Sequence, residues 1–325
     1  MAIPKKSVTT ASLIEEAIDS LLRGDGKELD AYLSKVEAEV PILDTRANVH
    51  CYVISHDGND QPRVKDLAKA VASRMIDYAI PRGELLKARE YMLKHNSFAK
   101  MTELQKKARS LFTTLSNTGE GGEMLLYMLI QNFLRLPQIM CKMSLKTNSQ
   151  LHYNGSDALH MTFDKKSQKL ALYWGESKLY KSVDKAITDC LDSIRPFLCD
   201  DGGSNSRQTR DLQLMSSFLD LGDPDLESAL LRYLDPDDPH FNKLQYRGAC
   251  LIGFDETFYP QKPNTKSEEE VIEEVRSSLE NWGKKLSNKI INRTPLDSII
   301  MEIFLVPFPS VEEYRKSFLG EIQNA

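Results

Sequence analysis

The sequence predicts an α/β fold with a mixed central sheet flanked by helices. First, segments rich in β-forming residues alternate along the chain with amphipathic helical patterns, which is typical of a sheet covered by helices on both faces. Second, residues 246–255 and 298–306 are apolar runs of strand length, as expected of buried strands. Third, residues 155–178 contain two apolar arms around a polar turn, the pattern of a β-hairpin.

Composition excludes several classes of protein. With 325 residues, 41% of them apolar and 27% charged, the chain resembles an ordinary globular protein. We expect a cytoplasmic protein without a membrane segment, because there is no apolar run of about 18 residues and no apolar signal-peptide core. A net charge of −5 argues against a free-standing, high-affinity nucleic-acid binder. The five scattered cysteines lack metal-ligand spacing, and no phosphate-loop motif for ATP hydrolysis is present.

The first third of the chain is expected to be an α/β accessory region at residues 1–98, before a larger domain at residues 99–325. Residues 11–39 have helical spacing interrupted at Gly24, which predicts two short helices around a turn. Residues 48–55 have the composition of a strand.

Residues 64–115 carry mostly helical patterns with a break at Pro81. The charged helices in this stretch have solvated faces opposite an apolar stripe. Their lysines and arginines could also form a DNA-facing surface, although ordinary solvated faces are the simpler interpretation.

Residues 119–134 predict an apolar helix with a glycine-rich start. Glu123 shares a helical face with apolar side chains such as Leu126 and Ile130. An unpaired buried carboxylate is costly, so we expect Glu123 to be paired, protonated or near a metal. Glu120, one turn earlier, is interpreted as a first-turn charge favoured by the helix dipole.

The remaining elements follow from shorter patterns. Residues 138–146 predict a strand, and residues 181–197 predict a helix with a packed apolar face. Residues 200–207 predict a Gly- and Ser-rich linker. Charged amphipathic helices are predicted at residues 267–286 and 311–322.

The hairpin within residues 155–178 has a testable register. If Phe163 pairs with Leu170 across the turn, alternation fixes the other pairs as well. These are Met161 with Leu172, Leu159 with Trp174, and Asp157 with Glu176. Three apolar pairs then share one face of the hairpin, and two carboxylates close its end.

The opposed carboxylates of Asp157 and Glu176 create an electrostatic problem. Directly opposed side chains have Cβ atoms about 5 Å apart, and like charges there are destabilising. The pair therefore needs a cation. Lys178 points to the same face as Glu176 because side chains alternate with period 2. Taken separately, these residues would be ordinary turn caps and surface ion pairs, and it is their shared face that makes them a candidate site.

In chain order, a helix with Glu123, a strand opening at Asp157 and a strand ending in Glu176-Ser177-Lys178 resemble the core of the PD-(D/E)xK nucleases. The resemblance implies a restriction-endonuclease-like core with an N-terminal α/β extension. In that superfamily, the Asp and the first acid of the (D/E)xK tripeptide bind a divalent metal ion.

A wider likeness involves four segments, GEGGEMLLY, GSDALH, LYWGESKLY and MEIFLVPFPSVEEYRKSF. They resemble the HamA family, the nuclease subunits of two-component Hachiman anti-phage defence systems. The resemblance extends from about Met101 to the C-terminus, and Ser156 departs from the superfamily pattern by standing where proline is common. The resemblance to the HamA family implies that the partner is a HamB-type helicase, an ATPase, and that the substrate is DNA.

The resemblance implies a Mg²⁺-dependent deoxyribonuclease, the effector of a defence complex, that cleaves with little sequence preference under control of its helicase. Asp157 and Glu176 would hold the metal, with the Ser177 carbonyl as a third ligand and Glu123 contributing directly or through water. Lys178 would orient the attacking water and offset charge on the phosphate. Mn²⁺ could replace Mg²⁺ because it takes the same ligand types.

Two other functions stay open from the sequence. A nuclease-like fold could serve as a non-catalytic module that docks on a helicase. The same acids and lysine could also belong to a metal-dependent hydrolase of RNA or nucleotides.

Overall fold

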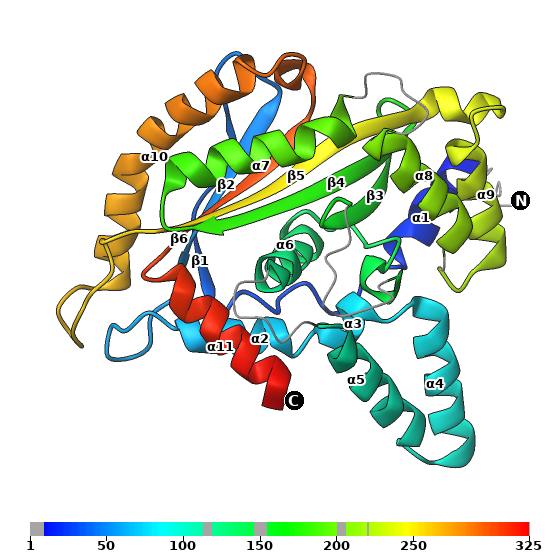
Figure 1. The fold of residues 1–325 in the computed structure, drawn as a ribbon, viewed down its shortest axis with the longest axis horizontal. Helices are drawn as coiled ribbons and strands as arrows, with labels where there is room; N and C mark the ends of the chain where they lie inside the picture. Colours follow the sequence, from blue (N-terminus) through cyan, green and yellow to red (C-terminus); the bar gives the residue numbers. More distant parts are fainter. Residues whose placement is uncertain (1–9, 113–118, 146–154, 200–205, 220, 325) are drawn as a thin grey trace, which may run out of the picture.

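A computed structural model describes residues 10–112, 119–145, 155–199, 206–219 and 221–324. Its strands form a six-stranded sheet with the order β1-β2-β6-β5-β4-β3 (Figure 1). The strands are β1 (Leu33–Pro41), β2 (Ala47–Ile54), β3 (Ala158–Asp164), β4 (Lys169–Tyr180), β5 (Leu244–Asp255) and β6 (Met301–Phe308). The four central strands are parallel, and β1 and β3 pair antiparallel at the two edges. The predicted mixed α/β sheet is confirmed.

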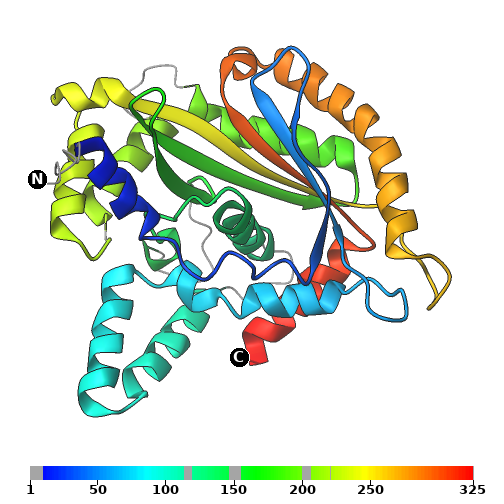
Figure 2. The same ribbon diagram turned by 180° about the vertical axis from the view of Figure 1, so that it is seen from behind.

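Helices cover both faces of this sheet (Figures 1 and 2). Helices α7 (Val183–Leu198) and α10 (Glu268–Ile291) lie on one face. Helices α2 (Val64–Ala72), α6 (Glu120–Phe133) and α11 (Val311–Asn324) lie on the other. The predicted helices at these positions are therefore confirmed.

The other helices lie at the periphery. Near β3 are α1 (Thr10–Asp19), α8 (Arg207–Phe218) and α9 (Pro224–Leu234), whereas α3 (Met75–Ala79), α4 (Arg82–His95) and α5 (Ala99–Leu111) connect β2 and α2 to α6. Short 3-10 helices occur at Lys142–Leu145, Pro239–Lys243 and Leu296–Ser298. None of the helices in the described residues is both long enough and apolar enough to cross a membrane.

The second helix predicted within residues 11–39 is wrong, because the chain forms the edge strand β1 there. Leu33, Val36 and Val40 face the core at spacings of three and four, which imitates a helix. The cause is the pairing with β2, which has two register shifts between Lys35 and Val40. Such bulges add residues to one strand and break the period of 2.

The strand predicted at residues 138–146 is also wrong. Gln138 makes an isolated antiparallel bridge to His160 of β3, and residues Lys142–Leu145 turn into a 3-10 helix. The chain leaves the sheet edge here because the ammonium group of Lys142 is drawn into a buried polar cluster described below. Residue 146 lies outside the described residues.

The linker predicted at residues 200–207 lies mostly outside the described residues. Where the description resumes, Ser206 caps α8 by accepting a hydrogen bond from the Thr209 backbone N–H at 3.0 Å. Helices α8 and α9 were not predicted from the sequence. They matter because α8 supplies a buried acid next to the candidate site.

The N-terminal strands continue the same sheet as the C-terminal strands. Strand β2 pairs in parallel with β6, and both belong to one cluster of buried apolar side chains. Strands from before and after residue 98 thus belong to one sheet. The domain division at that residue stays a prediction.

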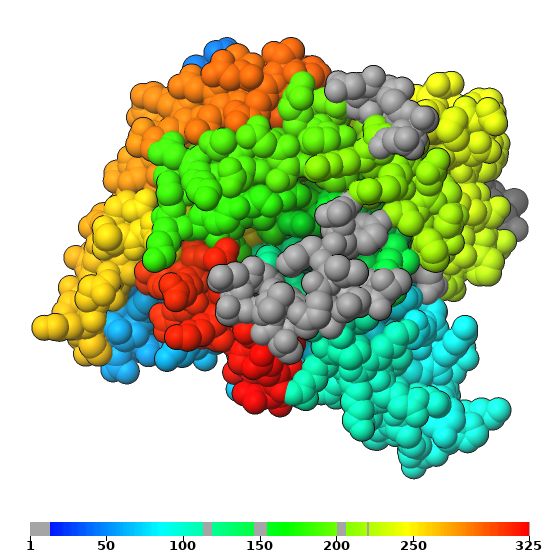
Figure 3. Space-filling model, viewed as in Figure 1, coloured from blue at the N-terminus to red at the C-terminus, as the bar shows by residue number. Residues whose placement is uncertain are grey.

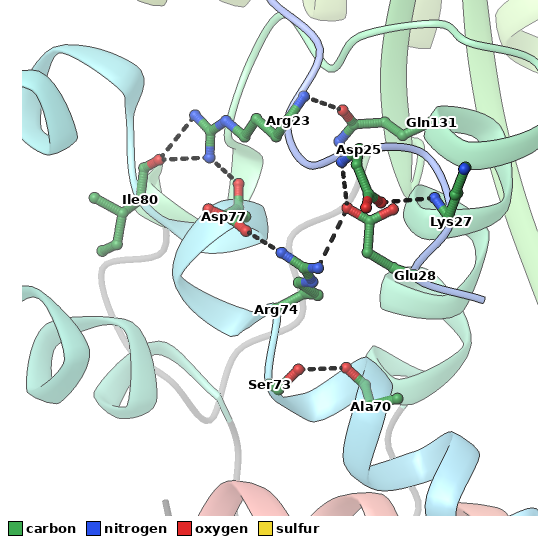
Figure 4. A network of polar contacts seen from close by, with 10 residues as sticks. All are labelled: Arg23, Asp25, Lys27, Glu28, Ala70, Ser73, Arg74, Asp77, Ile80 and Gln131. Atoms are coloured by element: carbon green, nitrogen blue, oxygen red, sulfur yellow. Dashed lines mark hydrogen bonds and ion pairs between the residues drawn. The ribbon is translucent and has the colours of Figure 1, made fainter. Parts of the chain in front are cut away.

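A polar network joins the segment after α1 to helices α3 and α6 (Figure 4). The backbone N–H of Arg23 donates to the side chain of Gln131 in α6 at 3.0 Å, and its guanidinium donates to the carbonyl oxygen of Asp77 in α3. Arg74, which precedes α3, pairs with Glu28 at 3.2 Å. The network ties the segment after α1 to α3 and to Gln131 near the C-terminal end of α6.

Candidate active site

The hairpin register is as the sequence predicts. Leu159 lies opposite Trp174, and the other two apolar pairs follow in step. The backbone N–H of Asp157 donates to the carbonyl oxygen of Gly175 at 2.9 Å. The pairing therefore continues one residue beyond β3, and Asp157 is held beside the segment that contains Glu176.

Ser177 fixes the carboxylate of Asp157. Its backbone N–H and its hydroxyl both donate to Oδ2 of Asp157, each at 2.8 Å. The other oxygen, Oδ1, accepts no hydrogen bond from the described residues. One side of this carboxylate is therefore oriented by β4, and the other side is available to a ligand.

Glu176 is the more deeply buried of the two acids, with 4% of its surface exposed. One of its oxygens, Oε1, accepts a hydrogen bond from Nζ of Lys178 at 2.5 Å, and Ser193 of α7 also donates to the carboxylate. Lys178 and Glu176 lie on one face of β4, as alternation predicts.

The two carboxyl groups disfavour each other's ionisation. Burial, followed by the negative charge of Asp157, raises the pKa of Glu176 to about 8. Burial also raises the pKa of Asp157, although the positive charge of Lys178 and the hydrogen bonds from Ser177 oppose the change. The ammonium group of Lys178 is therefore not enough to offset the buried carboxylate of Glu176 together with the partly buried one of Asp157.

Lys178 stays charged in this site. Burial by itself would lower the pKa of Lys178, but the carboxylates of Glu176 and Asp157 reverse that effect and raise its pKa above the ordinary value. A lysine with a raised pKa does not accept a proton near neutral pH. It can donate hydrogen bonds and attract negative charge.

The glycine-rich start of α6 allows this helix to approach the site. A Cβ atom on Gly122 would lie 2.5 Å from Cδ1 of Leu179 and 3.2 Å from Oγ of Ser177, so a side chain there would force the Leu179 side chain of β4 to move. On the preceding residue, the Gly121 carbonyl accepts a hydrogen bond from the Tyr314 hydroxyl of α11 at 2.9 Å. The first turn of α6 is thus packed between β4 and α11.

The acids of α6 do not lie quite as the sequence suggests. Glu120, expected to be a simple first-turn charge, is only 2% exposed, whereas Glu123 is partly exposed. Glu123 accepts a hydrogen bond from the hydroxyl of Tyr78 in α3 at 3.2 Å. It is therefore paired, as expected, and its partner is a tyrosine that the sequence did not single out.

The structure brings Asp157, Glu176, Ser177 and Lys178 together, but Glu123 does not complete a three-acid cluster. Across the described ranges, no group of three or more His, Cys, Asp or Glu side chains is arranged to hold a metal ion. Asp157 and Glu123 both raise the pKa of the buried Tyr78, after burial itself, so the α6 acid lies in the same electrostatic neighbourhood. A contribution from Glu123 through water stays a prediction.

Sequence reasoning missed a second buried cluster beside the acid pair. Nζ of Lys142 donates to Oδ2 of Asp211 in α8 at 2.7 Å, and to the carbonyl and hydroxyl oxygens of Ser156 at 2.9 and 2.7 Å. All three residues are buried. From the sequence, Lys142 lies on one face of the strand predicted at residues 138–146, where it could approach phosphate or be solvated, and no local pattern connects it with an acid 69 positions away.

The residues present fit a hard divalent cation. The donors at the hairpin end are carboxylate oxygens, which Mg²⁺ and Mn²⁺ prefer. Oδ1 of Asp157 has no protein donor among the described residues, and the carboxyl groups of Asp157 and Glu176 carry an excess of negative charge that Lys178 leaves uncompensated. A divalent cation bound there would remove that excess.

Comparison with known proteins gives one family. The model of the HamA family matches residues 30–322. No curated protein matches the chain. The match includes both strands of the hairpin, helix α6 and the N-terminal strands β1 and β2.

Proposed function

The chain belongs to the HamA family, and on this premise we propose that it is the metal-dependent DNA nuclease of a two-component Hachiman anti-phage defence complex. Its substrate is DNA, its cofactor is Mg²⁺ or Mn²⁺, and its partner is a HamB-type helicase that holds the nuclease in check. The alternative is a non-catalytic module that docks on such a helicase.

One observation carries the proposal. The buried carboxyl group of Glu176 and the partly buried one of Asp157 lie on opposed strands at the end of a hairpin, and a lysine that remains charged lies within hydrogen-bonding distance of Glu176. A purely structural site would gain stability by replacing one of these acids with a neutral residue. Retaining both acids makes sense where they hold a cation.

The chain's own groups have distinct tasks in phosphodiester hydrolysis. Ser177 orients the Asp157 carboxylate, and Ser193 and Lys178 orient that of Glu176. Lys178 donates to the attacking water or to a non-bridging phosphate oxygen, and offsets the charge that develops on that oxygen. A Mg²⁺ ion bound by the two carboxylates would lower the pKa of the attacking water and neutralise phosphate charge.

The division of labour with a helicase is supported by what the sequence lacks. The chain has no phosphate-loop motif, and its net charge of −5 disfavours tight DNA binding on its own. It also has no motif for reading base edges, which supports cleavage with little sequence preference.

The test is a cleavage assay with the purified chain and with the complex formed with the helicase. DNA and RNA are compared side by side, with Mg²⁺ or EDTA and with or without ATP. Variants Glu176→Gln and Lys178→Ala should lose DNA cleavage and still assemble with the helicase. A matched control, Lys262→Ala, removes an exposed lysine far along the chain and should cleave normally.

Three outcomes would count against the proposal. Cleavage that persists in Lys178→Ala would show that the site is elsewhere. A wild-type complex that assembles but cuts neither DNA nor RNA would favour the non-catalytic module. Metal-dependent cleavage of RNA alone would keep the site and change the substrate.

A further inference from the structure

Helices α4 and α5 form a hairpin that projects from the body of the protein (Figures 1 and 2). Helix α4 packs against α5, and α5 packs against α3. In α4 the buried residue is Ala88, and in α5 the buried residues are Leu104 and Ala108. Most of the surface of both helices therefore faces solvent, and the space-filling view shows the pair as a protruding knob (Figure 3).

The hairpin is basic in an acidic protein. Residues 82–111 contain eight Lys and Arg residues against three Glu residues, a net charge of +5 in a chain of net charge −5. The rest of the chain therefore carries a net charge of −10. Such segregation of charge is characteristic of a surface that binds a polyanion.

Four of the eight basic side chains of the hairpin are available to bind a ligand. Within the hairpin, Lys107 pairs with Glu84 at 2.6 Å and Lys100 pairs with Glu103 at 2.7 Å. Four others are exposed and have no ion pair with any described residue. They are Lys87, Arg89, Lys94 and Lys106.

The base of the hairpin lies next to the acids of α6. At the end of α5, the ring of Phe112 lies 6.4 Å from that of Tyr78 and 6.3 Å from that of Phe318 of α11. Tyr78 in turn donates its hydroxyl hydrogen to Glu123. The rings of Phe112 and Tyr78 thus connect the base of the hairpin to Glu123, beside the candidate active site.

We propose that the α4–α5 hairpin is a DNA-binding arm that holds the phosphate backbone of the strand delivered to the acid pair. The inference rests on the proposed function and names the surface that recognises its substrate. Lys87, Arg89, Lys94 and Lys106 contact phosphates. Contacts of this kind hold DNA without reading its sequence, in keeping with cleavage of little sequence preference.

The dimensions and the tip of the arm fit this substrate. A helix of 14 residues is about 21 Å long, enough to follow about six base pairs of duplex. At the tip, Leu93 and Phe98 are 71% and 69% exposed. An exposed aromatic ring between basic residues is a surface on which an unpaired base can stack.

The experiment measures DNA binding by the full chain, with EDTA present so that cleavage cannot occur. Fluorescence anisotropy of labelled duplex and single-stranded DNA is recorded over a range of salt concentrations. The arm variant carries Lys87→Gln, Arg89→Gln, Lys94→Gln and Lys106→Gln. A control variant with the same change in net charge carries Lys35→Gln, Lys69→Gln, Lys243→Gln and Lys262→Gln, all at exposed positions.

The arm variant should bind DNA at least about tenfold more weakly at low salt, and the slope of log affinity against log salt should fall by about 3 to 4 as four phosphate contacts are lost. The control variant should keep a slope close to that of the wild type. Because all eight positions are exposed, both variants should unfold at nearly the wild-type temperature.

Several results would overturn the inference. These are wild-type protein that does not bind DNA at low salt, equal losses in both variants, or no loss in either. An arm variant that binds DNA normally but no longer assembles with the helicase would identify the hairpin as a protein interface instead. Binding is measured without metal, so the binding result does not depend on cleavage. If the arm binds DNA but the protein never cleaves it, only the nuclease proposal is refuted. If the protein cleaves DNA but the arm variant binds DNA as tightly as the wild type, only the proposal that the α4–α5 hairpin binds DNA is refuted.

Discussion

Two buried clusters of charge meet at the peptide bond between Ser156 and Asp157, and they are built differently. In the closed cluster, one lysine, Lys142, is matched with one acid, Asp211, and Ser156 supplies two further hydrogen-bond acceptors. In the open cluster, two acids share the ammonium group of Lys178, and the charge of Lys142 makes only a smaller contribution at Asp157.

The difference separates a structural ion pair from a site for a ligand. Lys142 and Asp211 balance each other in charge, although the second carboxylate oxygen of Asp211, Oδ1, is buried without a hydrogen-bond partner among the described residues. In the open cluster, Asp157 and Glu176 repel each other and both have raised pKa values. Removing a charge should therefore have opposite effects on stability in the two clusters, and this contrast can be tested.

The largest expected effect is on catalysis. Glu176→Gln keeps the shape of the side chain and removes a charge needed to hold the metal, so cleavage should fall by a factor of about 10² or more, comparable to the loss of a principal charge-stabilising group. The measurement is the rate of DNA cleavage by the complex with Mg²⁺. Retention of most of the activity would contradict the assignment of Glu176.

The next effect is on folding. Lys142→Met leaves Asp211 buried without its cation, which should lower the free energy of unfolding by about 3–5 kcal/mol. The double variant Lys142→Met with Asp211→Leu should recover much of that loss, because no buried charge remains unpaired. Urea unfolding measures both. If the double variant is no more stable than the single one, the pair is not a closed unit.

In the open cluster, removing a charge should instead raise the free energy of unfolding. Because the folded-state pKa of Glu176 is raised from 4.5 to about 8, the folded protein holds this proton more tightly than the unfolded chain. The stability linked to Glu176 is therefore full below about pH 4.5, and is lost as the pH rises through about 8.

It follows that Asp157→Asn, which removes one of the repelling charges, should raise the stability of the metal-free protein at pH 8 by on the order of 1–2 kcal/mol. The gain should shrink toward pH 5, where Glu176 is protonated in the folded state. Thermal unfolding in EDTA across this pH range measures it. A variant that is less stable than the wild type at pH 8 would refute the repulsion.

The smallest expected effect concerns Glu123 of α6. Tyr78→Phe removes the hydroxyl that donates to Glu123, and should cost about 1 kcal/mol of unfolding free energy. The same substitution combined with Glu123→Gln should cost less than the sum of the two single effects. Additive effects would show that the Tyr78 to Glu123 contact contributes little.

The hairpin and the closed cluster also show what a sequence can and cannot predict. The register of β3 and β4 follows from a short turn and strict alternation, so Asp157, Glu176 and Lys178 could be placed together from the sequence alone. Ser267 and Glu270, which form a capping box at the start of α10, are likewise a local signal. In both cases, residues close in sequence determine the structure.

Elements that depend on distant partners were not predictable in this way. Strand β1 imitates a helix because its irregular pairing with β2 shifts the buried positions. Lys142 is buried because α8, far along the chain, brings Asp211 to it. Tyr78 contacts Glu123, 45 positions away, because α3 packs against α6. None of these contacts leaves a trace in the local sequence pattern.

The central claim, that the open cluster is a metal site, is tested most directly by titrating the EDTA-free protein with Mn²⁺ at pH 8 and counting bound ions by electron paramagnetic resonance. The wild type should show a saturable site from which Mg²⁺ displaces Mn²⁺. The site should be lost in Glu176→Gln and kept in the control Glu280→Gln, which changes an exposed acid of α10. Equal Mn²⁺ binding by the wild type and Glu176→Gln, or no binding by the wild type, would contradict the account.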